Sequence, residues 1–307
     1  MTRTLSRSPR ERGLALIVAM LIAALAAAVA VSVATAQSQW SSRVLHRRDQ
    51  VEAQSIAQAG IQWARTILEA DGATAGAIDH PGEPWALPLP PTPVENGEVE
   101  GRIVDAQAFL NVNNLASPTH AAFERARFAR LFAMHGVRAS VLPALVDWVD
   151  ADDVAEANGA EDGWYLRQAD ATLAANGPAI RFEEIASVRN VDVGTLTRLA
   201  PYVTALPVDT PLNVNTAPAD VLAATLPDVK PETIAALVAS RATHPFSSIS
   251  EFRERAGGAI GDETAYSVNS HYFIVTVRSR QGETHARARA LVERTGGTST
   301  IVWQTLE

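Results

Sequence analysis

The longest apolar stretch of the chain runs from Gly13 to Ala36 and contains no ionisable side chain. An α-helix of ~20 apolar residues spans the hydrocarbon core of a bilayer, so this stretch predicts a membrane-spanning helix. From Arg43 to Leu68 apolar residues recur at helical spacing among Gln, Arg and Glu, with almost no helix-breaking residues. We therefore predict one helix over residues 14–72 that begins in the membrane and ends in water.

Strand patterns occur on both sides of the central part of the chain. Residues 72–97 are rich in proline, which fits neither a helix interior nor a central strand, so we expect a surface connection with one short edge segment near 85–89. Alternation of apolar and polar residues predicts a strand over 98–106. The segments 272–280 and 284–294 flank a Gln-Gly-Glu turn and predict a β-hairpin, and a third strand is expected at 300–306. Residues 73–108 and 266–307 thus predict one antiparallel sheet packed on the helix.

The region between these strands has a helical pattern and a weak internal repeat. The segment Leu110-Asn111-Val112-Asn113-Asn114-Leu115 recurs as Leu212-Asn213-Val214-Asn215-Thr216-Ala217, and each copy precedes a proline and a helix-like run. Asparagine and threonine before a helix accept hydrogen bonds from its first free amides, so we interpret these residues as caps and turn formers. Two related helical subdomains, 109–205 and 206–265, are predicted as one insertion.

Composition limits the classes of protein that fit. The chain has 307 residues, 47% of them hydrophobic, no cysteine and a formal net charge of −8. Disulfides are therefore excluded, and a general nucleic-acid surface, which is normally basic, is disfavoured. The nucleophile-elbow, zinc-protease and phosphate-loop motifs are absent, and the histidines are scattered. We predict a structural protein and no enzyme.

One acidic segment is a candidate for metal chemistry. Asp147-Trp148-Val149-Asp150-Ala151-Asp152-Asp153 is followed by Asn158-Gly159-Ala160-Glu161-Asp162. Carboxylates this dense repel one another unless a cation neutralises them, and Ca²⁺ takes six to eight oxygen ligands from flexible loops. The spacing is not that of an EF-hand, and a solvated acidic loop is the alternative.

The N-terminus carries the first resemblance to a known family. Arg3, Arg7, Arg10 and Arg12 stand against a single Glu11, and such a basic leader is expected to stay cytoplasmic while the chain after Ala36 faces outward. A leader ending in Gly13, followed by Leu14 and a long apolar helix, resembles type IV pilins and type II secretion pseudopilins. The resemblance implies that prepilin peptidase removes residues 1–13 by cutting between Gly13 and Leu14. An uncleaved single-pass membrane anchor is the alternative.

Further features resemble one family within this class, the minor pseudopilins K of type II secretion. The class usually has glutamate as its fifth mature residue, whereas counting from Leu14 gives Val18, and the K family is known for this absence. Its members also have an Asp-Trp-x-Asp-x-Asp stretch in a calcium-binding helical domain and the Asn-Val-Asn-Thr-Ala module found here at 213–217. Carried over by position, the resemblance implies calcium ligands at Asp150, Asp152, Glu161 and Asp162, with Asp147 and Asp153 as further candidates.

The resemblance also implies a fold and a function. The expected fold is α+β: a pilin-like helix on a small antiparallel sheet, with a large all-helical insertion. The expected protein sits in the bacterial inner membrane with its bulk in the periplasm, and it initiates or caps a short filament with other minor pseudopilins during export of folded proteins. The alternative function is a membrane-tethered DNA receptor, because 212–252 is also similar to helix-hairpin-helix modules. Its hairpin, Pro227-Asp228-Val229-Lys230-Pro231, lacks the glycines whose amides would approach phosphate, so we expect no nucleic-acid partner.

Overall fold

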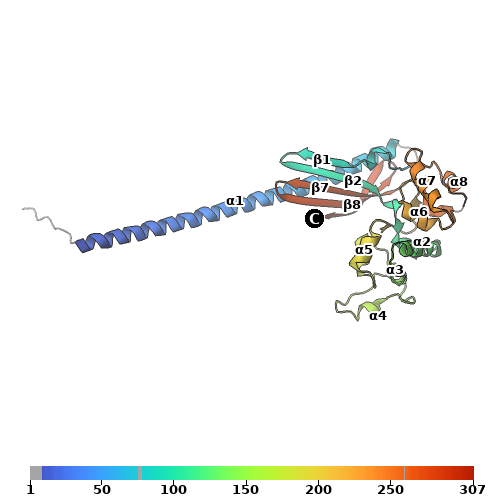
Figure 1. The fold of residues 1–307 in the computed structure, drawn as a ribbon, viewed down its shortest axis with the longest axis horizontal. Coiled ribbons are helices and arrows are strands. Elements are labelled where there is room, and N and C mark those ends of the chain that lie inside the picture. The colour runs from blue at the N-terminus through green and yellow to red at the C-terminus, as the bar shows by residue number, and fades with distance from the viewer. Residues whose placement is uncertain (1–8, 75–77, 259) are drawn as a thin grey trace, which may run out of the picture.

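A single long helix dominates the shape of the molecule. The computed structural model describes residues 9–74, 78–258 and 260–307, and its first element is α1 (Pro9–Thr74), 66 residues long. At 1.5 Å per residue this helix extends about 100 Å. Its N-terminal half projects away from the remainder of the protein, as Figure 1 shows. The predicted long helix over 14–72 is confirmed; residues 1–8 of the predicted leader lie outside the described residues.

The C-terminal half of α1 packs on a five-stranded sheet of order β1-β2-β7-β8-β9. Every neighbouring pair in it is antiparallel. The strands are β1 (Leu89–Val94), β2 (Gly97–Asp105), β7 (Tyr272–Gln281), β8 (Thr284–Thr295) and β9 (Thr298–Leu306). The predicted hairpin and its flanking strands are therefore confirmed.

The first strand differs from its prediction in position. A short 3-10 helix, η1 (Pro84–Ala86), occupies the first two residues of the segment 85–89, and β1 begins at its last residue with the sequence Leu-Pro-Pro-Thr-Pro-Val. Proline lacks an amide donor and so belongs on an edge strand, where one side of the backbone needs no partner. β1 pairs on one side with β2, and its register shifts between Leu89 and Thr92. The expectation of an edge segment is right, and its expected boundaries are wrong.

Small side chains let α1 lie close to the sheet. The buried positions of the helix recur every three or four residues and face β7 and β8. At Gly60 an added Cβ would lie 2.7 Å from Val277 Cγ1, so a larger residue would push the helix away. The residues of α1 in this core are Ala53, Ala57, Ile61, Ala64 and Leu68.

The segment between β2 and β7 forms a separate helical body with its own core. Its helices of at least seven residues are α2 (Ala121–Met134), α3 (Val141–Val149), α5 (Val193–Leu199), α6 (Ala219–Thr225), α7 (Pro231–Arg241) and α8 (Ile249–Arg255). Its short helices are η2 (Ala106–Ala108), η3 (Val112–Ala116), α4 (Asp162–Tyr165), η4 (Phe182–Ser187) and η5 (Glu263–Ala265).

The insertion is not wholly helical, in contrast to the prediction. The Leu-Asn pairs that open the two repeats are strands β3 (Leu110–Asn111) and β5 (Leu212–Asn213). Each pairs in parallel with a two-residue strand further along the chain, β4 (Val203–Thr204) and β6 (Tyr266–Ser267) respectively. These ladders are too short to leave a periodic pattern in the sequence. Each one ties the start of a repeat to a segment at or just after its end.

The repeated asparagines form turns and cross-links, as their interpretation as caps predicts. Asn111 accepts a hydrogen bond from the amide of Asn113, and Asn213 does the same for Asn215. The second asparagine of each copy then clamps the backbone of one distant residue. Asn113 bonds both the N–H and the C=O of Ala179, and Asn215 bonds both groups of Phe246.

Candidate metal centre and helix groove

The acidic loop brings three of its predicted ligands together. Asp150 terminates α3, where its amide donates to the carbonyl of Val146, and Glu161 stands at the N-cap of α4. Asp152 lies between them in the loop. One carboxylate oxygen from each of Asp150, Asp152 and Glu161 lies within 4.8 Å of the other two. This arrangement places three oxygen ligands around a common point.

The other candidate carboxylates have different partners or positions. Asp162 is not part of the mutually close group, because its carboxylate accepts a 2.8 Å hydrogen bond from the amide of Ala174. Asp147 is fully buried, and both its oxygens accept from the amide of Glu156 at 3.1 Å. Asp153 is exposed. Of the predicted ligands, the structure thus brings together Asp150, Asp152 and Glu161.

Residues not predicted from the sequence hold this loop in shape. An added Cβ at Gly159 would lie 1.9 Å from Asp147 Oδ2, so only glycine lets the loop close over that carboxylate. Arg189, from the turn after η4, donates from Nη1 to the carbonyl of Gly159 at 2.7 Å and lies over the ring of Trp164. No local sequence pattern signals this role of Arg189.

The carboxylates of the group lack the partners that buried charges need. Glu161 is 7% exposed, and within the described residues neither of its oxygens, nor Oδ1 of Asp150, has a hydrogen-bond partner. Burial, followed by repulsion from neighbouring carboxylates, raises the pKa of Glu161 to about 7 and that of Asp150 to about 6. A hard cation with oxygen ligands would satisfy these atoms, and the donor set fits Ca²⁺.

A second group of acidic residues already has a cationic partner within the chain. Asp71, Asp79 and Glu83 also have oxygens within 4.8 Å of one another, but Arg294 of β8 forms ion pairs with both Asp71 and Asp79. The Glu83 carboxylate accepts from Trp85 Nε1 at 2.9 Å. Burial raises the pKa of Asp71, and Arg294 opposes that rise. An arginine thus occupies the role that a metal ion would have in this group.

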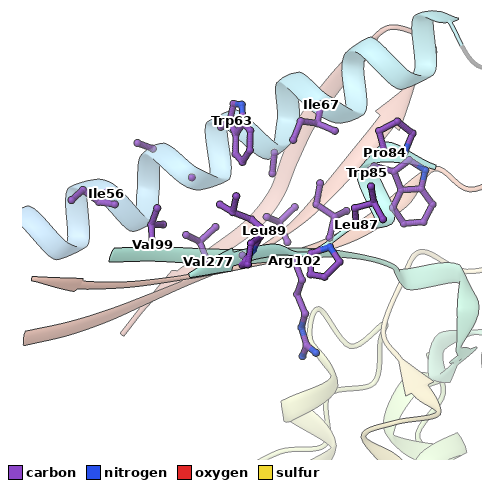
Figure 2. A pocket seen from close by; sticks show the side chains of 18 residues that line it. Ile56, Trp63, Ile67, Pro84, Trp85, Leu87, Leu89, Val99, Arg102 and Val277 are labelled. Carbon is purple, nitrogen blue, oxygen red and sulfur yellow. The ribbon is translucent and has the colours of Figure 1, made fainter. Parts of the chain in front are cut away.

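An apolar groove of about 540 Å³ follows α1. It lies between α1 and the part of the sheet formed by β1, β2 and β7, and Figure 2 shows side chains from both walls converging on it. Trp63 from α1 and Leu87 from the segment after η1 are more than half exposed there. The remaining labelled apolar side chains of its walls are Ile56, Ile67, Pro84, Trp85, Leu89, Val99 and Val277.

The predicted processing site lies on the projecting part of α1. Gly13 is inside the helix, and Leu14 is exposed. From Leu16 onward α1 is, among the described residues, the one helix long and apolar enough to cross a membrane. A membrane-length helix continuing into a half that packs on an antiparallel sheet defines a pilin-like protein.

Comparisons with known proteins identify the family. Two profiles described as type II secretion system protein K match residues 108–208 and 212–269. Type II secretion system protein K of Pseudomonas aeruginosa is 33% identical over 76% of this chain and 73% of its own length. The Klebsiella pneumoniae protein of the same name is 30% identical over 95% of both chains. The chain belongs to the type II secretion system protein K family.

A solved structure confirms the fold. A chain in the crystal structure of the GspK-GspI-GspJ complex from enterotoxigenic Escherichia coli superposes with a TM-score of 0.76 and 23% sequence identity. The match covers 86% of this chain and 99% of that one. The predicted α+β, pilin-like architecture is thus confirmed.

Proposed function

We propose that this protein is a minor pseudopilin at the tip of the type II secretion pseudopilus, where it initiates or caps the filament and assists export of folded proteins across the outer membrane. One observation carries the proposal. The N-terminal half of α1 is apolar and exposed, with Val18 in place of an acidic residue, and a large helical body lies toward the other end of the helix. Membership of the protein K family supports it.

The absence of a carboxylate at Val18 is consistent with a terminal position. A carboxylate inside a bilayer or filament core is costly unless it has a partner. In a pilin filament its partner is the N-terminal amine of the adjacent subunit. A subunit with Val18 can supply its own amine to a neighbour without requiring one in return, which suits the end of a filament.

The apolar groove beside α1 suits a helix from another minor pseudopilin. Its walls are apolar and open on one side, and burial of Trp63 and Leu87 would remove apolar surface from water. The structural neighbour comes from a complex of GspK with GspI and GspJ. We therefore propose the corresponding pseudopilins as partners, with prepilin peptidase releasing Leu14 as the new N-terminus in the inner membrane.

The acidic loop is proposed to bind calcium in the periplasm. Asp150, Asp152 and Glu161 would hold the ion, and its charge would relieve their mutual repulsion. The ion would fix the segment between α3 and α4 while leaving Asp162 bonded to Ala174. Its role is stabilisation of this body, which must remain folded without disulfides.

The proposed assembly is tested by co-purifying full-length protein with the GspI and GspJ counterparts from detergent-solubilised membranes. Trp63→Asp and Leu87→Asp should reduce recovery of the partners, because each places a charge in the groove. Val193→Asp is the matched control, since Val193 is more exposed than either and lies on α5, away from the groove. N-terminal sequencing with and without prepilin peptidase should show Leu14 first only in its presence.

The same preparation tests the alternative, DNA binding. The turn between α6 and α7 presents two prolines and Asp228, and Arg241 is occupied with the carbonyls of Val214 and Ala217 at 2.6 and 2.5 Å. We therefore expect no salt-sensitive duplex binding. Duplex binding without partner recovery would replace the tip proposal with a DNA receptor.

A further inference from the structure

A second cleft lies on the opposite face of the sheet from α1. It has a volume of about 490 Å³, and it separates strands β2, β7 and β8 from η4 and α5 of the insertion. Its sheet side carries Val104 and Ile274, and its other wall carries Phe109, Phe182 and Leu196. These side chains give the cleft an apolar interior that α1 does not cover.

Arginines from the sheet make the same cleft cationic. Arg102 lies opposite Thr276, and Thr276 lies opposite Arg289, so the two arginines belong to one row across three strands. Arg287, two residues before Arg289 on β8, also lines the cleft. Figure 2 shows the Arg102 side chain leaving β2 on the side away from α1, toward the insertion.

Neighbouring carboxylates leave part of this cationic surface unpaired. Glu183 in the opposite wall pairs with Arg289, and Glu307 Oε2 lies 4.0 Å from Arg287 Nη1. The Nε of Arg287 is closed to solvent and has no hydrogen-bond partner within the described part of the chain. Arg102 makes no ion pair or hydrogen bond through its side chain to any described residue. Arg102 therefore brings an unpaired guanidinium to the cleft, and Arg287 retains one donor, its Nε, without a partner among the described residues.

We propose that this cleft binds a short acidic segment of another protein, with carboxylates on Arg102 and Arg287 and an apolar side chain against Phe109 and Phe182. Guanidinium groups donate paired hydrogen bonds to carboxylates, which makes this the natural complement. The volume is within the ~300–1,000 Å³ usual for ligand sites. This inference goes beyond the tip assignment and does not depend on it, because one chain forms both walls.

The charge and position of the cleft favour a peptide over other anions. The chain has a net charge of −8, which repels a long polyanion such as nucleic acid from all but this local patch. Figure 1 shows that α5, which forms part of one wall of the cleft, lies away from the projecting apolar half of α1, and so away from lipid headgroups at the membrane.

Fluorescence anisotropy with full-length protein in detergent micelles tests the proposal. The probe is a fluorescein-labelled peptide in which aspartates alternate with phenylalanine and leucine. Binding is expected, and Arg102→Glu should weaken it by about tenfold or more through loss of a charge-assisted contact and added repulsion. Ala186→Trp should weaken it as strongly without changing charge, because Ala186 lines the cleft and is exposed.

Arg280→Glu is the matched control. Arg280 is on the same face of β7 but outside the cleft, at the far end of the strand, where it pairs with Glu98. The affinity of the Arg280→Glu variant for the peptide should equal that of the unaltered protein. The proposal is overturned if the peptide does not bind at millimolar concentration, or if Arg102→Glu and Ala186→Trp both bind it normally. Equal binding of a lysine-for-aspartate peptide, an oligothymidylate or phosphatidylglycerol vesicles would overturn it as well.

Discussion

The two acidic groups of this protein are similar clusters of three carboxylates, but among the residues that the structure describes only one of them has a cationic side chain as a partner. In the group of Asp71, Asp79 and Glu83, the two aspartates pair with Arg294, a permanent cation supplied by β8. Asp150, Asp152 and Glu161 come from one loop, and the described residues provide no arginine or lysine within ion-pair distance of them. The first group therefore joins α1 to the sheet through a cation of the chain itself, whereas the second has no such partner in the described part of the chain and is proposed to bind calcium from solution.

Removing the internal cation should produce the largest effect. Arg294→Met leaves the buried carboxylates of Asp71 and Asp79 without their partner, and the free energy of unfolding should fall by about 3–5 kcal/mol. Urea denaturation followed by tryptophan fluorescence measures the change. Arg278→Met, which breaks an exposed pair with Glu100, is the control and should cost less than about 1 kcal/mol. Equal losses in the two variants would contradict this account.

Removing calcium from the acidic loop should produce the second-largest effect. At free calcium about one hundred times its dissociation constant, binding should stabilise the protein by ~2.7 kcal/mol, and EGTA should reverse the gain. Thermal unfolding with and without calcium measures it. Asp150→Ala and Glu161→Gln should each abolish this response to calcium. The Arg294→Met variant should retain it. If chelation leaves the melting temperature of the unaltered protein unchanged, the assignment of these ligands is wrong.

The pH dependence of the calcium-free protein should sharpen the contrast. The folded-state pKa of Glu161, about 7, is above its unfolded value of 4.5, so the folded state binds the extra proton between these values. Stability should therefore fall as pH rises from 4.5 to 7, by roughly 1–2 kcal/mol once solvent screening is allowed for.

Urea titrations in EGTA at several pH values provide the measurement, and Glu161→Gln is the control. The difference in unfolding free energy between the unaltered protein and this variant should change across that range, because titrating groups that do not interact with Glu161 cancel. With saturating calcium the fall should disappear, since the ion favours the ionised carboxylate. A difference that is independent of pH in EGTA would show that Glu161 is not the group responsible.

The smallest effect concerns a residue that the sequence assigned to the metal. Asp162→Ala should leave calcium affinity unchanged in isothermal titration calorimetry, because Asp162 bonds the amide of Ala174 instead. It should lower the free energy of unfolding by about 1 kcal/mol through loss of that hydrogen bond. A large loss of calcium affinity would return Asp162 to the ligand set.

Much of the fold follows from patterns that recur along the sequence. The apolar stretch from Gly13 to Ala36 and the alternation in β7 and β8 each extend over enough residues to determine an element. The parallel ladders at Leu110 and Leu212 could not be predicted, because two residues have no periodicity and their partners lie far along the chain. The position of edge strand β1 was predicted wrongly for a related reason. Prolines show which structures a segment cannot form, but they do not show where a strand begins and ends.

The acidic loop was predictable in composition and less so in detail. Dense carboxylates indicated a cation, but the choice between Asp162 and its neighbours depends on where the chain turns after Glu161. The enclosing contacts of Arg189 with Gly159 join the loop to a different turn of the insertion and leave no local signal. Arg294 likewise contacts Asp71 across more than two hundred residues of sequence.

The position of the insertion has a consequence for how the chain folds. β2 ends at Asp105, which lies opposite Phe273 in β7, so the whole helical body is contained in the connection between two adjacent strands. Closing so long a loop before anything within it has folded is slow. We expect the insertion to fold first, after which Asn213 and Ser270, both bonded to Asp105, bring the strand ends into register. The sheet that holds the membrane helix is then completed last.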